Sequence, residues 1–256
     1  MEQTFVLRHK NIAIPCILDE PGFGTIEQVV LCVHGFGGSY KDTIQQGIAE
    51  EMAMFGAATM RFDFPAHGEN PEESLTLSGC VETLMAVAGE VKRRYPGMEN
   101  PCIFASGFGA YVTLVALEML QEMLGHIRLV VQTPSVRMDQ TLLAMIHRSK
   151  ETFAAMERMK LLAPRPFDVT YSFYEELHSH VVMVDHGTAM LILHGEADEY
   201  IRMEDIRNFA RINEQAKLVL IPGTTHQFLE EGAWDMVLDL TRDWFASEQV
   251  WLSDWE

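Results

Sequence analysis

Short apolar runs alternate along the chain with longer segments in which apolar residues recur at helical spacing. The runs at 28–33 (QVVLCV), 101–106 (PCIFAS) and 189–194 (AMLILH) are apolar at most positions, which is typical of parallel strands buried on both faces. The same reasoning predicts further strands at 12–18, 57–62, 127–132 and 216–221, and helices at about 40–55, 76–95, 108–124, 203–212 and 228–247. This alternation predicts an α/β fold, with a mostly parallel central sheet and helices on both faces.

The pattern changes between residues 135 and 185. Met, Arg and Lys mix there with aromatic residues, and Pro164 and Pro166 interrupt the run. Because the strand–helix alternation resumes afterwards, we interpret 135–185 as a helical insertion into a single domain that spans residues 1–256.

Composition narrows the possible partners and compartments. The 256 residues contain 19 basic and 37 acidic side chains, a formal net charge of −18, which disfavours nucleic acid and anionic membrane surfaces as partners. The four cysteines do not cluster, and Cys32 and Cys102 lie in or beside apolar strands as buried thiols would. The first residues lack the apolar core of a signal peptide, and no run reaches the roughly 18 apolar residues of a membrane span, so a cytoplasmic protein is expected.

Small and polar residues follow five of the predicted strands. Ligands of parallel α/β sheets bind at the carboxyl ends of the strands, so these positions are candidates for a functional site. The segments, in chain order, are His34-Gly35-Phe36-Gly37-Gly38, Asp63-Phe64-Pro65-Ala66-His67-Gly68, Gly107-Phe108-Gly109-Ala110, Gly195-Glu196-Ala197-Asp198 and Pro222-Gly223-Thr224-Thr225-His226.

The order HGFGG, DFPAHG, strand–elbow–helix, HGEAD and PGTTH resembles the α/β-hydrolase fold, and more closely the small bacterial esterases and serine-aminopeptidase-like hydrolases with a helical lid. The resemblance covers roughly residues 20–247. It implies that Asp198 is the acid and His226 the general base, because the chain order in this fold is nucleophile, acid, histidine. It also implies that Phe36 and Phe108 offer oxyanion-hole N–H groups, and that residues 135–185 form the lid.

The nucleophile of that family is absent from its expected place. The family's elbow reads G-x-S-x-G, whereas this chain reads Ala105-Ser106-Gly107-Phe108-Gly109, which puts Gly107 at the nucleophile position. Moving the frame to Ser106 would place Phe104 and Phe108 where strand, elbow and helix require small residues. Glycine tolerates the strained elbow backbone, so the turn is expected to persist without the chemistry.

Three explanations of Gly107 stay open. The natural protein lacks the serine, the serine was replaced deliberately, or the chemistry needs only the base and the oxyanion hole. The functional hypotheses follow from these: a carboxylesterase-like or acyl-hydrolase-like protein without its nucleophile, a non-catalytic binder of a small molecule, or a lyase or proton-transfer activity that uses His226. A structural alternative is that Asp198 and His226 only satisfy each other as buried polar groups.

The expected ligand is a small-molecule ester or an acyl or aromatic compound, with no cofactor. Gly35 and Gly37 in the first turn and Met138 and Met145 in the insertion are predicted to contact it, since methionines line adaptable apolar pockets. Asp63 is expected to brace the loops, and His67 to be structural. The cluster His178, His180, Asp185 and His186 matches no tight metal motif, so no metal is expected. The sequence carries no signal of an oligomeric state.

Overall fold

The computed structural model describes residues 1–70, 74–98, 100–161 and 167–247, and its centre is a sheet of eight strands in the order β1-β2-β4-β3-β5-β6-β9-β10. The strands from β4 to β10 run parallel, while β1 and β2 join the edge antiparallel. Their bounds are β1 Glu2–His9, β2 Ile12–Asp19, β3 Gln28–Val33, β4 Ala57–Phe62, β5 Cys102–Ser106, β6 Arg128–Gln132, β9 Met190–Gly195 and β10 Ala216–Ile221. The predicted fold class is confirmed.

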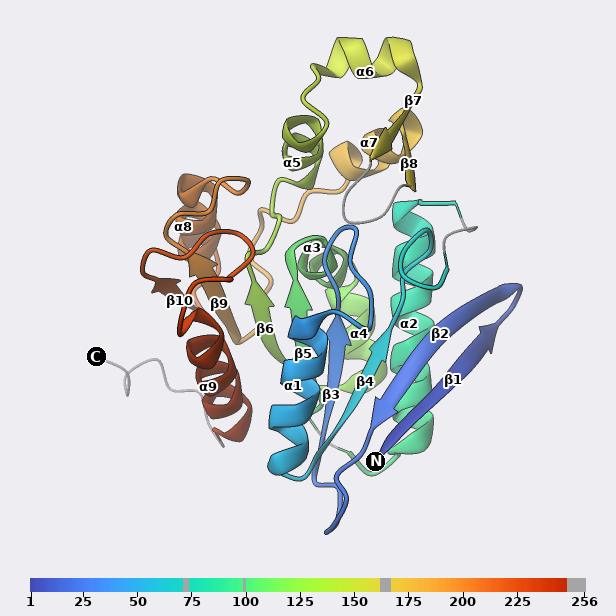
Figure 1. Ribbon diagram of the computed structural model, residues 1–256, viewed down its shortest axis with the longest axis vertical. Coiled ribbons are helices and arrows are strands. Elements are labelled where there is room, and N and C mark those ends of the chain that lie inside the picture. Colours follow the sequence, from blue (N-terminus) through green and yellow to red (C-terminus); the bar gives the residue numbers. More distant parts are fainter. Residues whose placement is uncertain (71–73, 99, 162–166, 248–256) are drawn as a thin grey trace.

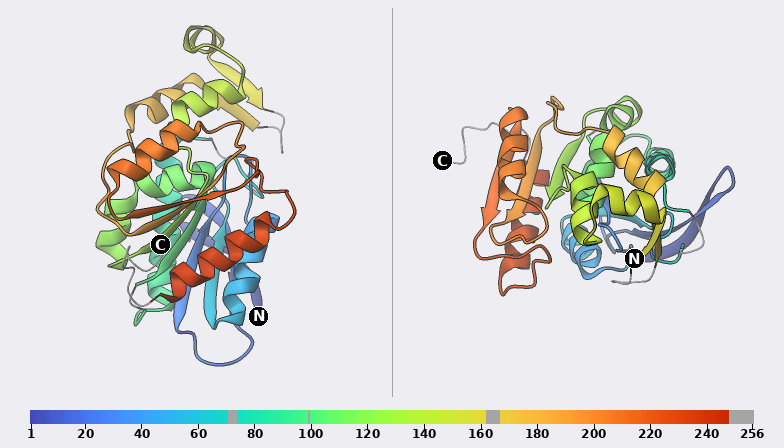
Figure 2. Two further views of the ribbon diagram at one scale, coloured as in Figure 1. Left: turned by 90° about the vertical axis from the view of Figure 1, so that its left-hand side faces the viewer. Right: turned by 90° about the horizontal axis from the view of Figure 1, so that it is seen from above.

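Helices cover both faces of this sheet, as Figures 1 and 2 show. On one face, α1 and α9 pack against alternate strand residues such as Val30, Cys32 and Phe104. On the other face, α2, α3, α4 and α8 pack on the remaining strand positions, such as Leu31 and Ile103. The helix bounds are α1 Thr43–Met54, α2 Leu77–Arg94, α3 Gly107–Val115, α4 Leu117–Leu124, α8 Met203–Ile212 and α9 Ala233–Ala246.

The segment between β6 and β9 stands over the carboxyl ends of the strands, at the top of Figure 1. It contains α5 (Met138–Met145), α6 (Lys150–Met156), a small hairpin of β7 (Arg158–Leu161) and β8 (Phe167–Thr170), and α7 (Tyr171–Ser179). We call residues 135–185 the inserted segment. The prediction of a purely helical insertion is wrong in one respect, because β7 and β8 pair as antiparallel strands. Pro164 and Pro166 lie outside the described residues.

Hydrogen bonds and aromatic contacts hold the inserted segment to the sheet domain. The Tyr111 hydroxyl of α3 donates to the carbonyl oxygens of Leu177 and His180, at 3.1 and 2.9 Å. The Phe173 ring of α7 lies 6.4 Å from Phe36 and 6.0 Å from Phe108, measured between ring centroids. The inserted segment is therefore packed directly on the turns that follow β3 and β5.

Two local features differ from the sequence prediction. The strand β1 was not predicted; its residues alternate between exposed and half-buried, and Lys10 at a φ of +51° turns the chain back into β2. The predicted helix 108–124 is divided at Ala116, whose φ of −91° and ψ of 0° end α3 before α4 begins. The Thr113 hydroxyl donates to the Gly109 carbonyl four residues earlier, a side-chain bond that favours bending of a helix.

None of the helices in the described ranges is long and apolar enough to cross a membrane. The four cysteines, Cys16, Cys32, Cys80 and Cys102, are buried free thiols.

Candidate active site

The turn from β5 into α3 is the sharpest feature of the site. Gly107 stands directly after Ser106, the last residue of β5, and is the first residue of α3, with a φ of +48°. A positive φ is costly for a residue with a Cβ and is readily adopted by glycine. A Cβ added at Gly107 would nevertheless meet no atom closer than 4.0 Å, from the Gly35 Cα and the Thr133 carbonyl oxygen. The backbone conformation therefore favours glycine, although the space in front of it is open.

Gly109, two residues further on, has the opposite environment. A Cβ there would overlap the carbonyl oxygen of His34 and lie 2.8 Å from that of Val33, so α3 passes directly against the end of β3. Backbone atoms cannot move aside as a flexible side chain can. Glycine is therefore required at 109 for steric reasons, and this requirement fixes the frame in which Gly107 occupies the elbow.

The loops after β9 and β10 bring Asp198 and His226 together. The His226 Nδ1–H donates to Asp198 Oδ2 at 2.8 Å, and Asp198 Oδ1 accepts the backbone N–H groups of Tyr200 and Ile201 at 2.8 and 2.9 Å. The Asp198 side chain is 1% exposed and that of His226 is 27% exposed. With Nδ1 as the donor, Nε2 of His226 keeps its lone pair and is available as a base.

The hydrogen bonds keep Asp198 ionised despite its burial. Burial pushes the pKa of Asp198 upward, but the hydrogen bond and charge of His226, together with the N–H groups of Ile201 and Tyr200, outweigh burial and hold that pKa below its ordinary value. A second imidazole, His194 at the end of β9, is fully buried with Nδ1 3.9 Å from Asp198 Oδ2, and burial lowers its pKa. The Asp198 carboxylate thus lies between two imidazoles.

The turn after β3 rests on a buried neutral histidine. The His34 Nδ1 lies 2.8 Å from the Gly35 carbonyl oxygen, and Nε2 accepts the Phe64 N–H at 3.0 Å, which together specify the neutral ring with its proton on Nδ1. Burial lowers the pKa of His34 to about 4. His67 is also buried, and burial lowers its pKa to about 3; its ring stacks on Phe108 with an interplanar angle of 11°. His67 therefore packs beneath the elbow, in keeping with the structural role expected of it.

Asp63 links the loops after β3 and β4. Its two carboxylate oxygens accept the backbone N–H groups of Tyr40 and Glu69, each at 2.7 Å. Burial raises the pKa of Asp63 to about 6 in spite of these two bonds. The predicted bracing role of Asp63 is confirmed by these contacts.

A cavity of about 680 Å³ opens beside Gly107 and His226. Its walls come from the turn after β3, the start of α1, the elbow, the end of β6 and the loop after it, α5, the loops after β9 and β10, and the start of α9. Of the residues predicted for the site, it is lined by Gly35, Phe36, Gly107, Phe108, Met138, Met145 and His226. Gly37 does not line it, and with a φ of +73° it forms the turn instead. Asp198 does not line the cavity either; it is hydrogen-bonded to the His226 ring, which does.

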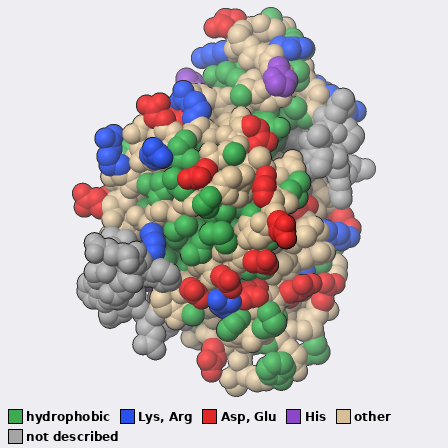
Figure 3. Space-filling view, turned by 60° about the vertical axis from the view of Figure 1, so that its left-hand side comes forward, with side chains coloured by type: hydrophobic (Ala, Val, Ile, Leu, Met, Phe, Trp, Pro, Cys, Tyr) green, Lys and Arg blue, Asp and Glu red, His purple; other side chains and the backbone are tan. Residues whose placement is uncertain are grey.

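Apolar side chains are prominent around the cavity mouth, where Leu229 is 76% and Tyr200 44% exposed. On the face shown in Figure 3, hydrophobic side chains gather in the middle and acidic side chains lie on several sides of them. Acidic side chains therefore flank an apolar centre on this face.

Comparisons with solved structures agree with this architecture. Ferulic-acid-bound Est1E from Butyrivibrio proteoclasticus is similar over 94% of this chain and 97% of its own, with a TM-score of 0.82 and 18% identity. Alpha/beta hydrolase domain-containing protein 10 from mouse is similar over 95% and 98%, with a TM-score of 0.76 and 14% identity. An alpha-beta serine hydrolase homologue from Coxiella burnetii is similar over 94% and 96%, with a TM-score of 0.67 and 19% identity.

This chain has the α/β-hydrolase fold. Its structural neighbours include bacterial esterases and serine hydrolases, all at low sequence identity. No family model and no curated protein matches the sequence.

Several residues of the candidate site were not singled out from the sequence. The end of β6 and the loop after it line the cavity with Gln132, Thr133 and Ser135, and the Ser135 N–H donates to the Gly107 carbonyl at 3.2 Å. The strand-end rule used for the other loops applies equally to β6 and would have found them. Tyr200, whose ring lies 5.2 Å from that of His226 in an edge-on arrangement, follows Asp198 in the chain but has no motif of its own.

The predicted histidine cluster is dispersed in space. His178 pairs with Asp139 at 2.9 Å, His180 lies 2.8 Å from the Glu176 carbonyl oxygen, and the His186 N–H donates to Asn213. Among the residues that the structure describes, no group of three His, Cys, Asp or Glu side chains is arranged to hold a metal ion.

Proposed function

We propose that this chain is an esterase-like protein that binds a small acyl or aromatic ligand beside the elbow and lacks the covalent nucleophile, because Gly107 occupies its position. The observation that carries the proposal is the elbow itself. Its backbone has the positive φ of a nucleophile turn, and a Cβ at Gly107 would meet open space on the cavity side. A serine hydroxyl placed there would share the cavity with His226.

The remaining parts of an acyl-transfer site have assigned roles in this proposal. His226 is the general base, and Asp198 fixes its tautomer and stabilises the imidazolium. The backbone N–H groups of Phe36 and Phe108 form the oxyanion hole, the latter at the N-terminus of α3. Removing one such donor typically costs about 3–4 kcal/mol of transition-state stabilisation, so this geometry contributes even without a nucleophile.

The cavity favours an acyl or aromatic ligand. Phe36, Met138, Met145, Leu229 and Trp234 supply apolar and aromatic walls, while the hydroxyl and amide groups after β6 supply polar ones. That the similar Est1E structure holds ferulic acid supports an aromatic carboxylic acid or its ester as the ligand class. The inserted segment contributes Met138 and Met145 to the cavity, and we propose that it acts as the lid.

Restoring the serine tests the proposal. Gly107→Ser is expected to hydrolyse p-nitrophenyl esters and to be labelled at that serine by a fluorophosphonate, whereas the unaltered chain and the matched Gly107→Ala variant do neither. His226→Ala in the serine background separates base-assisted hydrolysis from background reaction. A folded Gly107→Ser variant that neither hydrolyses esters nor accepts the label contradicts the proposal.

A second candidate function is favoured by the intact acid–base pair. A chain without a nucleophile keeps a 2.8 Å bond between His226 and a fully buried carboxylate, an arrangement that can activate water or abstract a proton from a bound ligand. Activity in the unaltered chain that disappears in His226→Ala would support this candidate. Ligand binding without turnover in either the unaltered or the serine variant would instead indicate a non-catalytic binder.

A further inference from the structure

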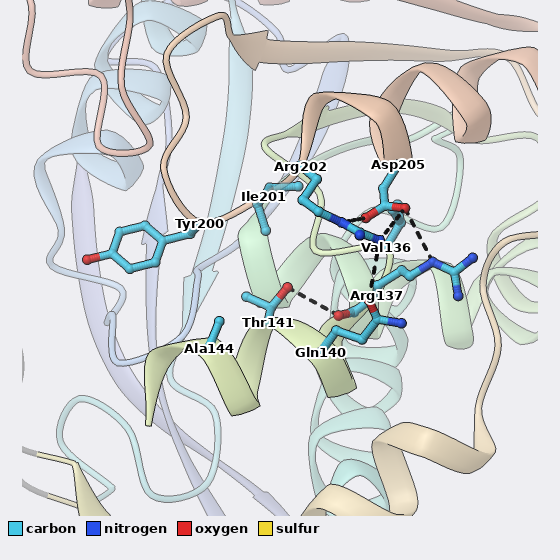
Figure 4. Close-up of a pocket in the computed structure, with 9 residues that line it drawn as sticks. All are labelled: Val136, Arg137, Gln140, Thr141, Ala144, Tyr200, Ile201, Arg202 and Asp205. Carbon is cyan, nitrogen blue, oxygen red and sulfur yellow. Dashed lines mark hydrogen bonds and ion pairs between the residues drawn. The ribbon is translucent and has the colours of Figure 1, made fainter. Parts of the chain in front are cut away.

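A smaller cavity of about 200 Å³ lies between α5 of the inserted segment and the start of α8. Figure 4 shows its nine lining residues, which are Val136, Arg137, Gln140, Thr141, Ala144, Tyr200, Ile201, Arg202 and Asp205. Thr141 and Tyr200 also line the larger cavity. The two cavities therefore share walls, and Tyr200 packs against His226 where they meet.

Two guanidinium groups in this small cavity share one carboxylate. Arg202 Nε and Nη2 donate to the two oxygens of Asp205 at 2.8 and 3.1 Å, and Arg137 Nε lies 3.4 Å from Asp205 Oδ1. Figure 4 shows the Arg202 guanidinium and the Arg137 Nε directed at Asp205, with the terminal nitrogens of Arg137 beyond it and Tyr200 at the opposite end of the cavity. The lining thus carries one more positive than negative charge, in a chain whose net charge is −18.

Hydrogen-bond donors also outnumber acceptors at this end of the cavity. A guanidinium has five N–H donors and no acceptor. Within the described ranges, Arg137 Nη1 and Nη2 have no hydrogen-bond acceptor, and Gln140 uses its Oε1 to accept from Arg202 Nη2 at 3.4 Å, which leaves its amide N–H groups unengaged. A planar anion with two oxygens is the ligand that such donors match best.

We propose that the small cavity binds a carboxylate carried by the ligand, so that the ligand is an acyl compound with a second, anionic end. The acyl part of this assignment rests on the proposed function, because it places the ester or acyl group beside Gly107 and His226. Thr141 and Tyr200 would then contact the middle of the ligand. Glu204, also at the start of α8, is exposed and does not line the cavity.

Solvent exposure limits the size of the effect. The side chains of Arg137 and Arg202 are 44% and 64% exposed, so their attraction for an anion is screened. We expect roughly a fivefold preference for an anionic over a neutral ligand at low salt, and a smaller preference as ionic strength rises.

Calorimetric titration of the unaltered chain tests the charge preference directly. The probes are monomethyl succinate, glutarate, adipate and suberate, each compared with its neutral dimethyl ester. One of the monoanions is expected to bind severalfold more tightly than its dimethyl ester. Equal binding of every anionic and neutral pair, at low salt, would overturn the inference.

Two variants that change the charge of the cavity in opposite directions distinguish loss of carboxylate binding from general damage to the fold. Arg137→Gln should weaken binding of the preferred monoanion severalfold, whereas Asp205→Asn should strengthen it, because it raises the positive charge of the lining. Arg207→Gln removes the same charge from an exposed position of α8 outside the cavity and should leave binding unchanged. Weaker binding in both Arg137→Gln and Asp205→Asn would overturn the inference.

The proposed function can fail separately from this inference. Suppose that Gly107→Ser hydrolyses esters with the same kcat/KM for the anionic monomethyl esters and the neutral dimethyl esters, and that the titrations also show equal binding. The esterase-like assignment then survives and the carboxylate site does not. If Gly107→Ser is inactive while the unaltered chain still prefers the monoanion, the carboxylate site survives and the acyl-transfer assignment does not.

Discussion

The two ends of the candidate site differ in the chemical groups that they carry. At the base end, Asp198 accepts three hydrogen bonds and holds His226 in one tautomer, so both the geometry and the chemical groups are present. At the elbow end, the backbone turn at Gly107 and the open space beside it are present, and Gly107 itself carries no side chain. The backbone geometry of the elbow and the chemical groups of the acid–base pair can therefore be tested separately.

The two ends are also stabilised by different physics. The base end depends on an ionised carboxylate and charge-assisted hydrogen bonds. The elbow end depends on close backbone packing at Gly109, on the neutral ring of His34, and on the contacts among Phe36, Phe108 and Phe173. Changes in charge should therefore affect the base end, and changes in volume the elbow end.

The largest expected effect is on catalysis in the Gly107→Ser background, where the elbow end and the base end would act together. In the Gly107→Ser background, His226→Ala and Asp198→Asn should each lower kcat by about 10³- to 10⁴-fold, because the base is lost or held in the wrong tautomer. Ester hydrolysis with unchanged circular dichroism spectra provides the measurement. Retention of activity within tenfold in Asp198→Asn would mean that the base end does not act as proposed.

The next effect separates the two glycines of the elbow. Gly109→Ala should lower the free energy of unfolding by about 3 kcal/mol or more, because its methyl group meets backbone carbonyls that cannot move aside. Gly107→Ala should cost only about 1–2 kcal/mol, the strain of a positive φ without a clash. Urea unfolding of both variants measures the difference, and equal costs would contradict the steric assignment.

Acidification should weaken the turn after β3 through His34. The pKa of His34 is lowered from 6.5 to about 4, so between these values the unfolded chain binds a proton that the folded chain does not. Stability supported by neutral His34 is present above about pH 6.5 and falls by roughly 1.4 kcal/mol per pH unit as the pH drops toward 4. The contribution of Asp198 is lost only at lower pH, as the pH falls through its depressed pKa.

His34→Gln tests this assignment. Between about pH 6.5 and about pH 5, the unfolding free energy of the variant should rise less steeply with pH than that of the unaltered chain. The difference in slope should correspond to close to one proton. Asp63, with its pKa raised to about 6, acts with the opposite sign, since it favours folding as the pH falls from 6 toward 3.8. Because Asp63 is the same in both proteins, comparing their slopes removes its contribution. An unchanged slope in His34→Gln would contradict the prediction.

The smallest expected effect concerns Ser106. Its Oγ donates to Gln132 Oε1 at 3.1 Å, which engages the hydroxyl in a bond across β5 and β6. In the Gly107→Ser background, Ser106→Ala should change esterase activity by no more than about twofold and stability by about 1 kcal/mol. A large loss of activity would show that the elbow end uses the neighbouring serine.

The central strands could be predicted from the sequence because each is a run of consecutive apolar residues, such as QVVLCV, that is apolar on both faces. The sequence prediction missed β1, whose alternation between exposed and half-buried residues is weak, and it missed the hairpin of the inserted segment. The small residues Gly107 and Gly109 could be aligned with an elbow from the sequence alone. The difference between them could not, because it depends on the His34 carbonyl, which belongs to another strand.

The sequence by itself determined the order of the central strands and the helices between them, the acidic net charge and the glycine at the elbow, since each can be obtained from the residues without knowing which of them are in contact. The tertiary structure alone decided which side chains meet. The strand order β5-β6-β9-β10 brings the loop of Asp198 to that of His226, and the packing of α5 near α8 brings Arg137 to Asp205. Such contacts depend on how distant segments pack, and periodicity along one segment carries no information about its neighbours in space.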